Sequence, residues 1–272
     1  MKIKLLSDVH TEFWTDQELK PGTGEVLILA GDIGLVSDLG TKHGYIFQQF
    51  LELCASGYEK VFYVMGNHEH YHFDVERTAD TLRTYLPGNF TLLDDSSEFF
   101  RGVHFVGGTM WADFEKGNKE VMWDCQQAMT DYHLTLKGDR ELTPKDTLKL
   151  HEESVEWFDD CLDSLRGPVV VITHHAPSFR SVTGRYADST ISGAYYSDRE
   201  SMIMKYPNIV NWCHGHVHRT SNYYIGECNV IANPFGYHPD ALNEEFSKSY
   251  EFEVIGDEHL SENPCQGLLT TL

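Results

Sequence analysis

Long apolar runs are missing from this chain of 272 residues. None of its segments approaches the roughly 20 apolar residues that a transmembrane helix needs. The first residues, Met1 to Leu6, run into an acidic residue without the apolar core and cleavage site of a signal peptide. We therefore expect a soluble, cytoplasmic protein that is not exported and has no membrane partner.

Basic side chains are scarce as well. The chain has 21 Lys and Arg against 42 Asp and Glu, which gives a formal net charge of −21. Such a surface repels a nucleic-acid backbone unless a local cationic site intervenes, so a nucleic-acid partner is possible but disfavoured. The 6 cysteines form no C-x-x-C pair and no tight framework, which favours reduced thiols in a cytosolic compartment.

Short apolar runs alternate with segments of helical periodicity, a pattern typical of an α/β protein. Buried strands are expected over residues 2–7, 26–30, 61–65, 169–172 and 209–213. Amphipathic helices are expected over residues 42–56, 74–86 and 146–166. Residues 90–111 predict short strands in a hairpin arrangement, and residues 221–233 predict two more strands.

The length suits one large domain, and no linker divides the chain, so we expect a single domain over residues 1–272. Two segments lack a core pattern. Residues at about 112–145 are polar with little periodicity and are interpreted as an excursion over the rim of the site. Residues at about 176–198 carry Gly, Ser, Thr and Tyr and are interpreted as a site-covering loop.

Five short polar motifs each follow a predicted strand. They are Asp8-x-His10, Gly31-Asp32, Gly66-Asn67-His68-Glu69, Thr173-His174-His175 and Gly215-His216-Val217-His218. Any one of them has an ordinary explanation: Asp-x-His is often a capping or turn pair, and Gly-Asp is commonly a turn. All five at strand ends are improbable by chance, so together they indicate a metal site at one end of a sheet.

The residue types in these motifs suit a pair of divalent ions. In extended backbone, residues at i and i+2 point to the same side, so Asp8 with His10, and His216 with His218, can each reach one cluster. Asp32 has two oxygens and could bridge two cations. Mixed His and carboxylate ligation suits Mn, Fe, Zn, Ni or Co better than Mg or Ca, and we favour Mn. Two such ions lower the pKa of a bridging water and clamp the attacking and leaving oxygens of an in-line displacement.

The motifs in this order resemble the calcineurin-like metallophosphoesterase superfamily, whose pattern is D-x-H, G-D, G-N-H-[DE], H, G-H-x-H, over residues 1 to about 235. The resemblance implies an α/β fold, a four-layer αββα sandwich with mixed β-sheets and a site at the C-terminal sheet edges. It makes His68 the residue that contacts the phosphoryl oxygens and can protonate the leaving group. It also implies that one ion is held by Asp8, His10 and His218, the second by Asn67, His174 and His216, and that Asp32 bridges them.

The chain also departs from parts of this superfamily. The protein Ser/Thr phosphatase branch has Asp-Arg-Gly shortly after Gly-Asp, whereas Asp32 is followed by Ile33-Gly34-Leu35-Val36, which argues against that branch. The segment Asn233-Pro234-Phe235-Gly236-Tyr237 is similar to one found in many small bacterial-type phosphoesterases, which supports a small substrate.

Several roles are expected around the ions. We predict catalytic roles for His68 and Asp32, and we expect Glu69 to hold an imidazole in its working tautomer. His175 remains an alternative to His174 as a ligand, and His214 is interpreted as a neighbour. Substrate contacts are predicted for Asn67, His68, Arg180, Arg185 and Tyr195, because guanidinium groups bind phosphate and rings stack on bases. For the loop residues Arg180, Arg185 and Tyr195, the alternative to a substrate contact is ordinary loop packing or surface charge.

The sequence thus predicts a metal-dependent phosphoric ester hydrolase with two divalent transition-metal ions as cofactors. Its substrate would be a phosphate mono- or diester of a small molecule or nucleotide, attacked by metal-bound hydroxide. A nuclease of the same superfamily is one alternative, which needs a basic track to the ions. A non-catalytic scaffold module with this fold is another, although such proteins usually lose the acid/base His or a ligand. Substrate identity and oligomeric state stay open.

Overall fold

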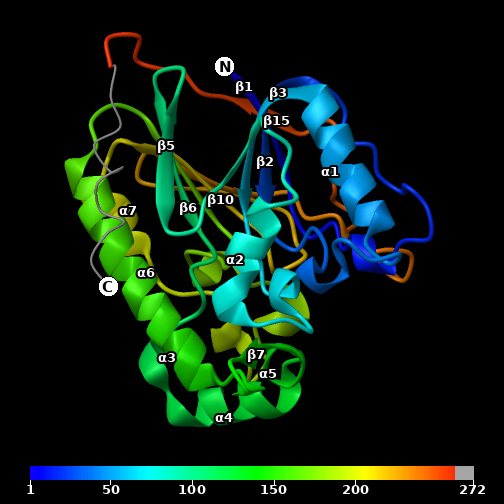
Figure 1. Ribbon diagram of the computed structural model, residues 1–272. Coiled ribbons are helices and arrows are strands. Elements are labelled where there is room, and N and C mark those ends of the chain that lie inside the picture. The colour runs from blue at the N-terminus through cyan, green and yellow to red at the C-terminus, as the bar shows by residue number, and fades with distance from the viewer. Residues whose placement is uncertain (261–272) are drawn as a thin grey trace.

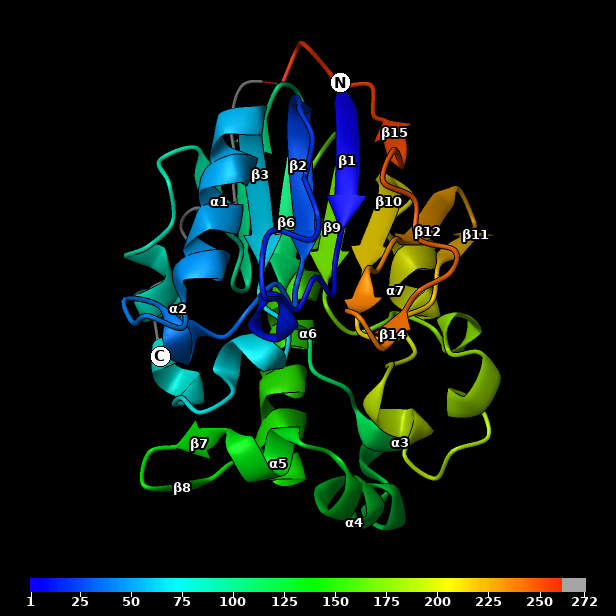
Figure 2. The same ribbon diagram turned by 90° about the vertical axis from the view of Figure 1, so that its right-hand side faces the viewer.

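Two β-sheets form the centre of the molecule (Figures 1 and 2). The computed structural model describes residues 1–260, and of Arg185 only the backbone. The first sheet contains β1 (Lys2–Leu6), β2 (Gly24–Ala30), β3 (Tyr58–Val64), β4 (Phe90–Leu92) and β15 (Glu251–Glu253). The second contains β5 (Ser96–Phe100), β6 (Val103–Gly108), β9 (Val169–Thr173), β10 (Ile209–His214), β11 (Ser221–Ile225) and β12 (Cys228–Ala232).

Both sheets are mixed. Their strand orders are β15-β1-β2-β3-β4 and β11-β12-β10-β9-β6-β5. In the first sheet β1 to β4 are parallel and β15 is antiparallel to β1. In the second sheet β6, β9, β10 and β12 are parallel, while β5 and β11 are antiparallel edge strands. The hairpin expected over residues 90–111 is β5 with β6, whereas β4 joins the other sheet.

Helices cover the outer face of each sheet, so the molecule has the expected four layers. The helices α1 (Tyr45–Gly57) and α2 (Val75–Arg83) lie on the first sheet, and α6 (Pro144–Ser164) and α7 (Glu200–Lys205) lie on the second. Figure 1 shows α1 and α6 on opposite sides of the two sheets. The four-layer αββα sandwich with mixed sheets is therefore confirmed.

Strand alternation divides the core into layers. In β2, Leu27 and Leu29 pack toward the helices, whereas Ile28 packs into the space between the sheets. Alternate residues of a strand point to opposite faces, and both faces of β2 are covered, so the run is apolar throughout. Phe62 and Phe105 stack across the two sheets with ring centroids 3.9 Å apart. This apolar centre holds the strand ends in fixed positions.

The polar segment at about 112–145 contains short elements that the sequence pattern did not indicate. They are α3 (Phe114–Gly117), α4 (Lys119–Ala128), α5 (Asp131–Leu134), β7 (Leu136–Lys137) and β8 (Arg140–Glu141). Their few apolar side chains, among them Phe114, Cys125 and Tyr132, form a separate small core with Trp111. So few buried residues in elements this short leave no clear period in the sequence.

The remaining elements are short. Two strands, β13 (Gly236–Tyr237) and β14 (Ala241–Leu242), form a small hairpin. The 3₁₀ helices span Thr11–Phe13, Val36–Asp38, His68–His70, Phe179–Ser181, Gly184–Tyr186 and Ser192–Ala194. The helix α6 starts at Pro144, two residues before its expected start, because Thr143 and Asp146 form a capping box ahead of it. Across residues 1–260, no helix is long and apolar enough to cross a bilayer.

Candidate metal centre

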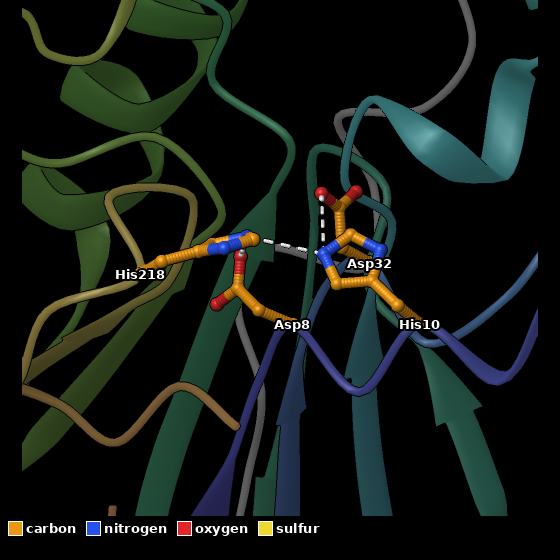
Figure 3. A group of neighbouring side chains, drawn as sticks. All are labelled: Asp8, His10, Asp32 and His218. Carbon is orange, nitrogen blue, oxygen red and sulfur yellow. Dashed lines mark hydrogen bonds and ion pairs between the residues drawn. The ribbon is translucent and has the colours of Figure 1, made fainter. Parts of the chain in front are cut away.

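The predicted metal ligands follow the C-terminal ends of strands of both sheets. Figure 3 shows four of them pointing toward one another: Asp8 and His10 after β1, Asp32 after β2, and His218 after β10. The backbone is left-handed at Asp8 (φ 53°), His10 (φ 51°), Asp32 (φ 55°), His216 (φ 68°) and His218 (φ 54°). Such conformations cost of order 1–3 kcal/mol each outside glycine and cluster at functional sites. These backbone conformations therefore lower the local stability of the chain, and they orient the five side chains toward the site.

The first group of ligands consists of Asp8, His10, Asp32 and His218, whose ligating atoms all lie within 4.8 Å of one another. His218 Nε2 lies 3.2 Å from Asp8 Oδ1 and 3.1 Å from His10 Nε2. His10 Nε2 lies 3.8 Å from Asp32 Oδ2. All except His218 are fully or almost fully buried, and the four side chains together could hold one metal ion.

The second group consists of Asp32, His174 and His216, again within 4.8 Å of one another. Asn67 adds an amide oxygen, since its Oδ1 lies 3.0 Å from His174 Nε2. Asp32 Oδ2 lies 3.4 Å from the same nitrogen. Asp32 thus belongs to both groups. The structure therefore brings together all the residues that the sequence predicted as ligands.

The chemistry of the cluster fits divalent cations. Asp8 Oδ2 and His216 Nε2 are buried with no hydrogen-bond partner among the described residues. Leaving such atoms unpaired costs roughly 1–3 kcal/mol each, which a bound ion would remove. Burial alone would lower the pKa of His174, but the Asp32 and Asp8 carboxylates raise it to about 10. A site that favours positive charge and offers both imidazole and carboxylate donors suits a transition-metal ion.

Glu69 supports the loops that carry the ligands. This fully buried carboxylate accepts hydrogen bonds from the backbone N–H groups of Asp32 (3.0 Å), Ile33 (2.8 Å) and Gly66 (2.6 Å), and from the Tyr63 hydroxyl (2.7 Å). Burial and the nearby Asp32 carboxylate raise the pKa of Glu69 to about 7. The expectation that Glu69 holds an imidazole is wrong, because its oxygens accept from the backbone of the two loops and from Tyr63 in β3.

Glu12 holds the imidazoles instead. Its Oε1 lies 2.8 Å from His68 Nδ1 and 3.1 Å from His10 Nδ1. A carboxylate only accepts, so both Nδ1 atoms carry the proton, and the Nε2 atoms are left for chemistry. Burial would raise the pKa of Glu12, but His10 and His68 lower it to about 2. Sequence reasoning missed Glu12, although it follows His10 at the same spacing that links His10 to Asp8.

Replacing Glu12 with glutamine should lower turnover about 10- to 100-fold with little change in KM, because residues that orient metal ligands and their neighbours typically contribute this much. The amide keeps the shape, and its oxygen can still accept, but it lacks the negative charge that holds the two imidazoles and keeps His68 protonated. Steady-state kinetics and metal content measured on the same samples check this. Glu52→Gln, on the exposed face of α1, is the control. A Glu12→Gln variant with normal kcat would contradict the assigned role.

His68 stands beside both ligand groups. Its backbone N–H donates to Asp32 Oδ1 (2.8 Å), and its Nε2 lies 3.9 Å from Asp32 Oδ2 and 3.4 Å from the Tyr237 hydroxyl. Burial alone would lower the pKa of His68, but the Asp32 carboxylate and the Glu12 hydrogen bond raise it to about 9. The ring is thus held as a proton donor next to the ligands.

The other histidines in the motifs belong to neither ligand group, although the His175 ring lies 4.3 Å from the His216 ring. His175 Nδ1 lies 3.3 Å from the Thr109 carbonyl oxygen, and burial lowers the pKa of His175 to about 3. His214 lies with Nε2 2.9 Å from Ser181 Oγ and with Nδ1 3.0 Å from the Gly215 carbonyl oxygen. His174 is therefore the member of the His-His pair that lies in a ligand group.

Of the loop residues predicted to contact the substrate, Tyr195 lines the cavity over the ligands and Arg180 does not. The Tyr195 ring lies 5.0 Å from the His216 ring and lines the cavity over the ligands. The Arg180 guanidinium lies over the Tyr223 ring at 4.3 Å and donates to the Tyr224 carbonyl oxygen, so its predicted substrate contact finds no support in its position. The side chain of Arg185 lies outside the described part of the structure, and its role stays a prediction.

A cavity of about 490 Å³ lies over the ligands and His68. The 112–145 segment and the 176–198 loop both contribute to its wall, for example through Met129, Asp131 and Tyr186. The Asn67 amide donates to the Tyr71 hydroxyl (3.0 Å), which donates to Asp131 Oδ1 (3.4 Å). This chain links a residue of the 112–145 segment to the second ligand group and turns the Asn67 oxygen toward His174.

Comparison with known proteins identifies the family. A family model described as calcineurin-like phosphoesterase matches residues 1–220. An uncharacterized protein of Acanthamoeba polyphaga mimivirus is 26% identical over 265 residues, which cover 89% of this chain and 93% of that protein. Phosphopantetheinyl hydrolase from Mycobacterium tuberculosis superposes with a TM-score of 0.67 at 18% identity, covering 87% of this chain and 89% of that chain, and so shares the fold. With most of its length matched by the family model, this chain belongs to the calcineurin-like phosphoesterase family.

Proposed function

We propose that this protein is a phosphoesterase with two divalent transition-metal ions that hydrolyses a phosphate mono- or diester of a small molecule or nucleotide. One observation carries the proposal: two ligand groups share Asp32 beneath a cavity, with His68 beside them. Membership of the calcineurin-like phosphoesterase family supports hydrolysis of a phosphoric ester. We favour Mn as the native ion.

The residues fall into three roles. Asp8, His10 and His218 would hold one ion, Asn67, His174 and His216 the second, and Asp32 both. When bound, the two ions supply a Lewis acid for the phosphoryl group and lower the pKa of water. Glu69 fixes the loops that carry Asp32 and Asn67, and Glu12 fixes the ring of His68.

His68 acts as the general acid in this proposal. With Nδ1 bonded to Glu12, its Nε2 faces the cavity and can donate a proton to the leaving oxygen. Asn67, His68 and Tyr195 contact the substrate, because all three line the cavity. The Tyr195 ring forms part of the wall against which the organic part of the ester packs. No side chain of this set needs to form a covalent bond with phosphorus.

Hydrolysis of p-nitrophenyl phosphate and bis-p-nitrophenyl phosphate by the purified protein tests the proposal. We expect Mn²⁺ to raise the rate about 10²-fold or more over protein treated with a chelator, because bound ions contribute several kcal/mol to transition-state stabilisation. Metal content is measured by elemental analysis on the assayed samples. Protein that holds Mn²⁺ but turns over neither ester would refute the proposed function.

The two alternatives gain less support. A nuclease needs a basic track to the ions, yet the described residues lining the cavity include no Lys or Arg, and four of them, Glu12, Asp32, Asp38 and Asp131, are acidic. A scaffold module usually lacks the acid/base His or a ligand, whereas this chain has His68 and both ligand groups in place. We therefore keep the phosphoesterase as the proposal.

A further inference from the structure

Two neighbouring recesses meet at His218. The cavity of about 490 Å³ and a second one of about 300 Å³ share Tyr186, His218 and Tyr237 in their walls. His218 belongs to the first ligand group, so a phosphoryl group bound there would lie next to both recesses. We propose that the substrate is an unsymmetrical phosphodiester whose two arms occupy these recesses. This inference rests on the proposed function and specifies its substrate.

The larger recess suits an arm without negative charge. Besides the ligand Asp32, its wall contains the carboxylates of Glu12, Asp38 and Asp131, and its described residues include no Lys or Arg. A second anionic group would therefore be repelled. Asp131 Oδ2 is buried without a hydrogen-bond partner among the described residues, so it can accept from a hydroxyl or amide of the arm.

The rest of the larger recess is mostly aromatic and apolar. Its wall includes Phe13, Leu35, Tyr71, Met129, Ile191 and Tyr195. Phe13 is 50% exposed and its ring packs edge-on against Tyr237 at 5.4 Å, so an apolar ring faces solvent at the entrance. Burying such surface against an apolar arm is favourable, roughly in proportion to the area removed from water. The arm in this recess is therefore uncharged and largely apolar, with hydrogen-bond donors.

The smaller recess has a different character. It contains Arg219, which forms no ion pair with any described residue, together with Ala241, Leu242, Asn243 and Glu244. Asn243 Nδ2 donates to Thr220 Oγ1 and to the Pro234 carbonyl oxygen, so it has no hydrogen left to donate to a substrate. Arg219 and Glu244 are both exposed, so this recess has one cation to set against one carboxylate, and Arg219 can bind an anionic group of the second arm through charge-assisted hydrogen bonds. A monoester would leave this recess without a role.

The position of His68 decides which arm leaves. His68 lines the larger recess and not the smaller one. A water oxygen forms a bond to phosphorus while the bond to the arm in the larger recess breaks. The departing oxygen takes a proton from His68, and the proton that the water loses restores the protonated form of His68, so that one water is consumed. The uncharged arm leaves as an alcohol, and the arm held by Arg219 keeps the phosphate as a monoester.

Two p-nitrophenyl phosphodiesters that differ only in the second arm test the inference on the Mn²⁺-loaded protein. We expect kcat/KM for p-nitrophenyl 3-carboxypropyl phosphate to exceed that for p-nitrophenyl butyl phosphate about tenfold, and both to exceed that for p-nitrophenyl phosphate. The variant Arg219→Gln should bring the ratio of the two diesters to about one. Arg83→Gln, an exposed arginine of α2, is the matched control and should keep the ratio.

A dialkyl ester tests the direction of cleavage. Butyl 3-carboxypropyl phosphate should give butanol and 3-carboxypropyl phosphate, as followed by ³¹P and ¹H NMR. Equal turnover of the two p-nitrophenyl diesters, an unchanged ratio in Arg219→Gln, faster turnover of the monoester, or butyl phosphate as the main product would each overturn the inference. Turnover of none of the p-nitrophenyl esters with Mn²⁺ bound would instead refute the proposed function itself.

Discussion

Replacing Asp32 with asparagine should cost the protein at least one bound ion and lower phosphoesterase turnover about 10³-fold or more. One ligand group contains His218 and the other contains His174. Among the described residues, only Asp32 belongs to both of these groups. Its Oδ2 lies 3.4 Å from His174 Nε2 and 3.8 Å from His10 Nε2. Asparagine removes the negative charge and one acceptor oxygen. The ions contribute several kcal/mol of transition-state stabilisation, and each 1.36 kcal/mol is about tenfold in rate.

Elemental analysis of metal per chain, together with kcat/KM on bis-p-nitrophenyl phosphate, measures this effect. Asp80→Asn in α2 is the matched control, because the Asp80 carboxylate is 87% exposed and pairs only with Arg83 among the described residues. Circular dichroism shows whether both variants remain folded. An Asp32→Asn protein that keeps two ions and wild-type turnover would be incompatible with a shared ligand.

Replacing His68 with alanine should leave both ions bound and reduce kcat about 10²-fold or more. His68 lies in neither ligand group that contains Asp32, and its Nε2 faces the cavity. A positioned general acid typically raises the reaction rate 10²–10⁴-fold, and its contribution grows with the basicity of the leaving oxygen. The loss should therefore be larger for a phenyl ester than for a p-nitrophenyl ester, because phenolate is the more basic leaving group.

The comparison of the two esters separates acid catalysis from a structural role. A His68→Ala protein that had merely lost its local structure would lose both activities equally, and it would also lose metal. His43→Ala is the control, because His43 is exposed and lies ahead of α1. Equal losses on the two esters, or an unchanged kcat, would show that His68 does not donate the proton.

Much of the fold can be predicted from the sequence because buried strands carry a local signal. The run Val26 to Ala30 is apolar at every position since β2 is covered on both faces, by α1 on one side and by the second sheet on the other. Strand partners carry no such signal. Phe90 to Leu92 reads like part of the following hairpin, yet it pairs in parallel with β3. The short elements between residues 112 and 145 bury too little to show a period.

The sequence by itself determined the family and the set of predicted ligands, because each of these residues comes shortly after a strand and the motifs occur in one order along the chain. Only the tertiary structure decided that Glu12, and not Glu69, is the carboxylate that holds an imidazole. Glu12 and His68 are 56 positions apart in the sequence, and the backbone turns of their two loops bring the Glu12 carboxylate to the His68 ring. The tertiary structure alone also placed Arg219 in one recess and Asp131 in the other. Such contacts depend on distances between segments remote in the chain, which no local pattern of residues encodes.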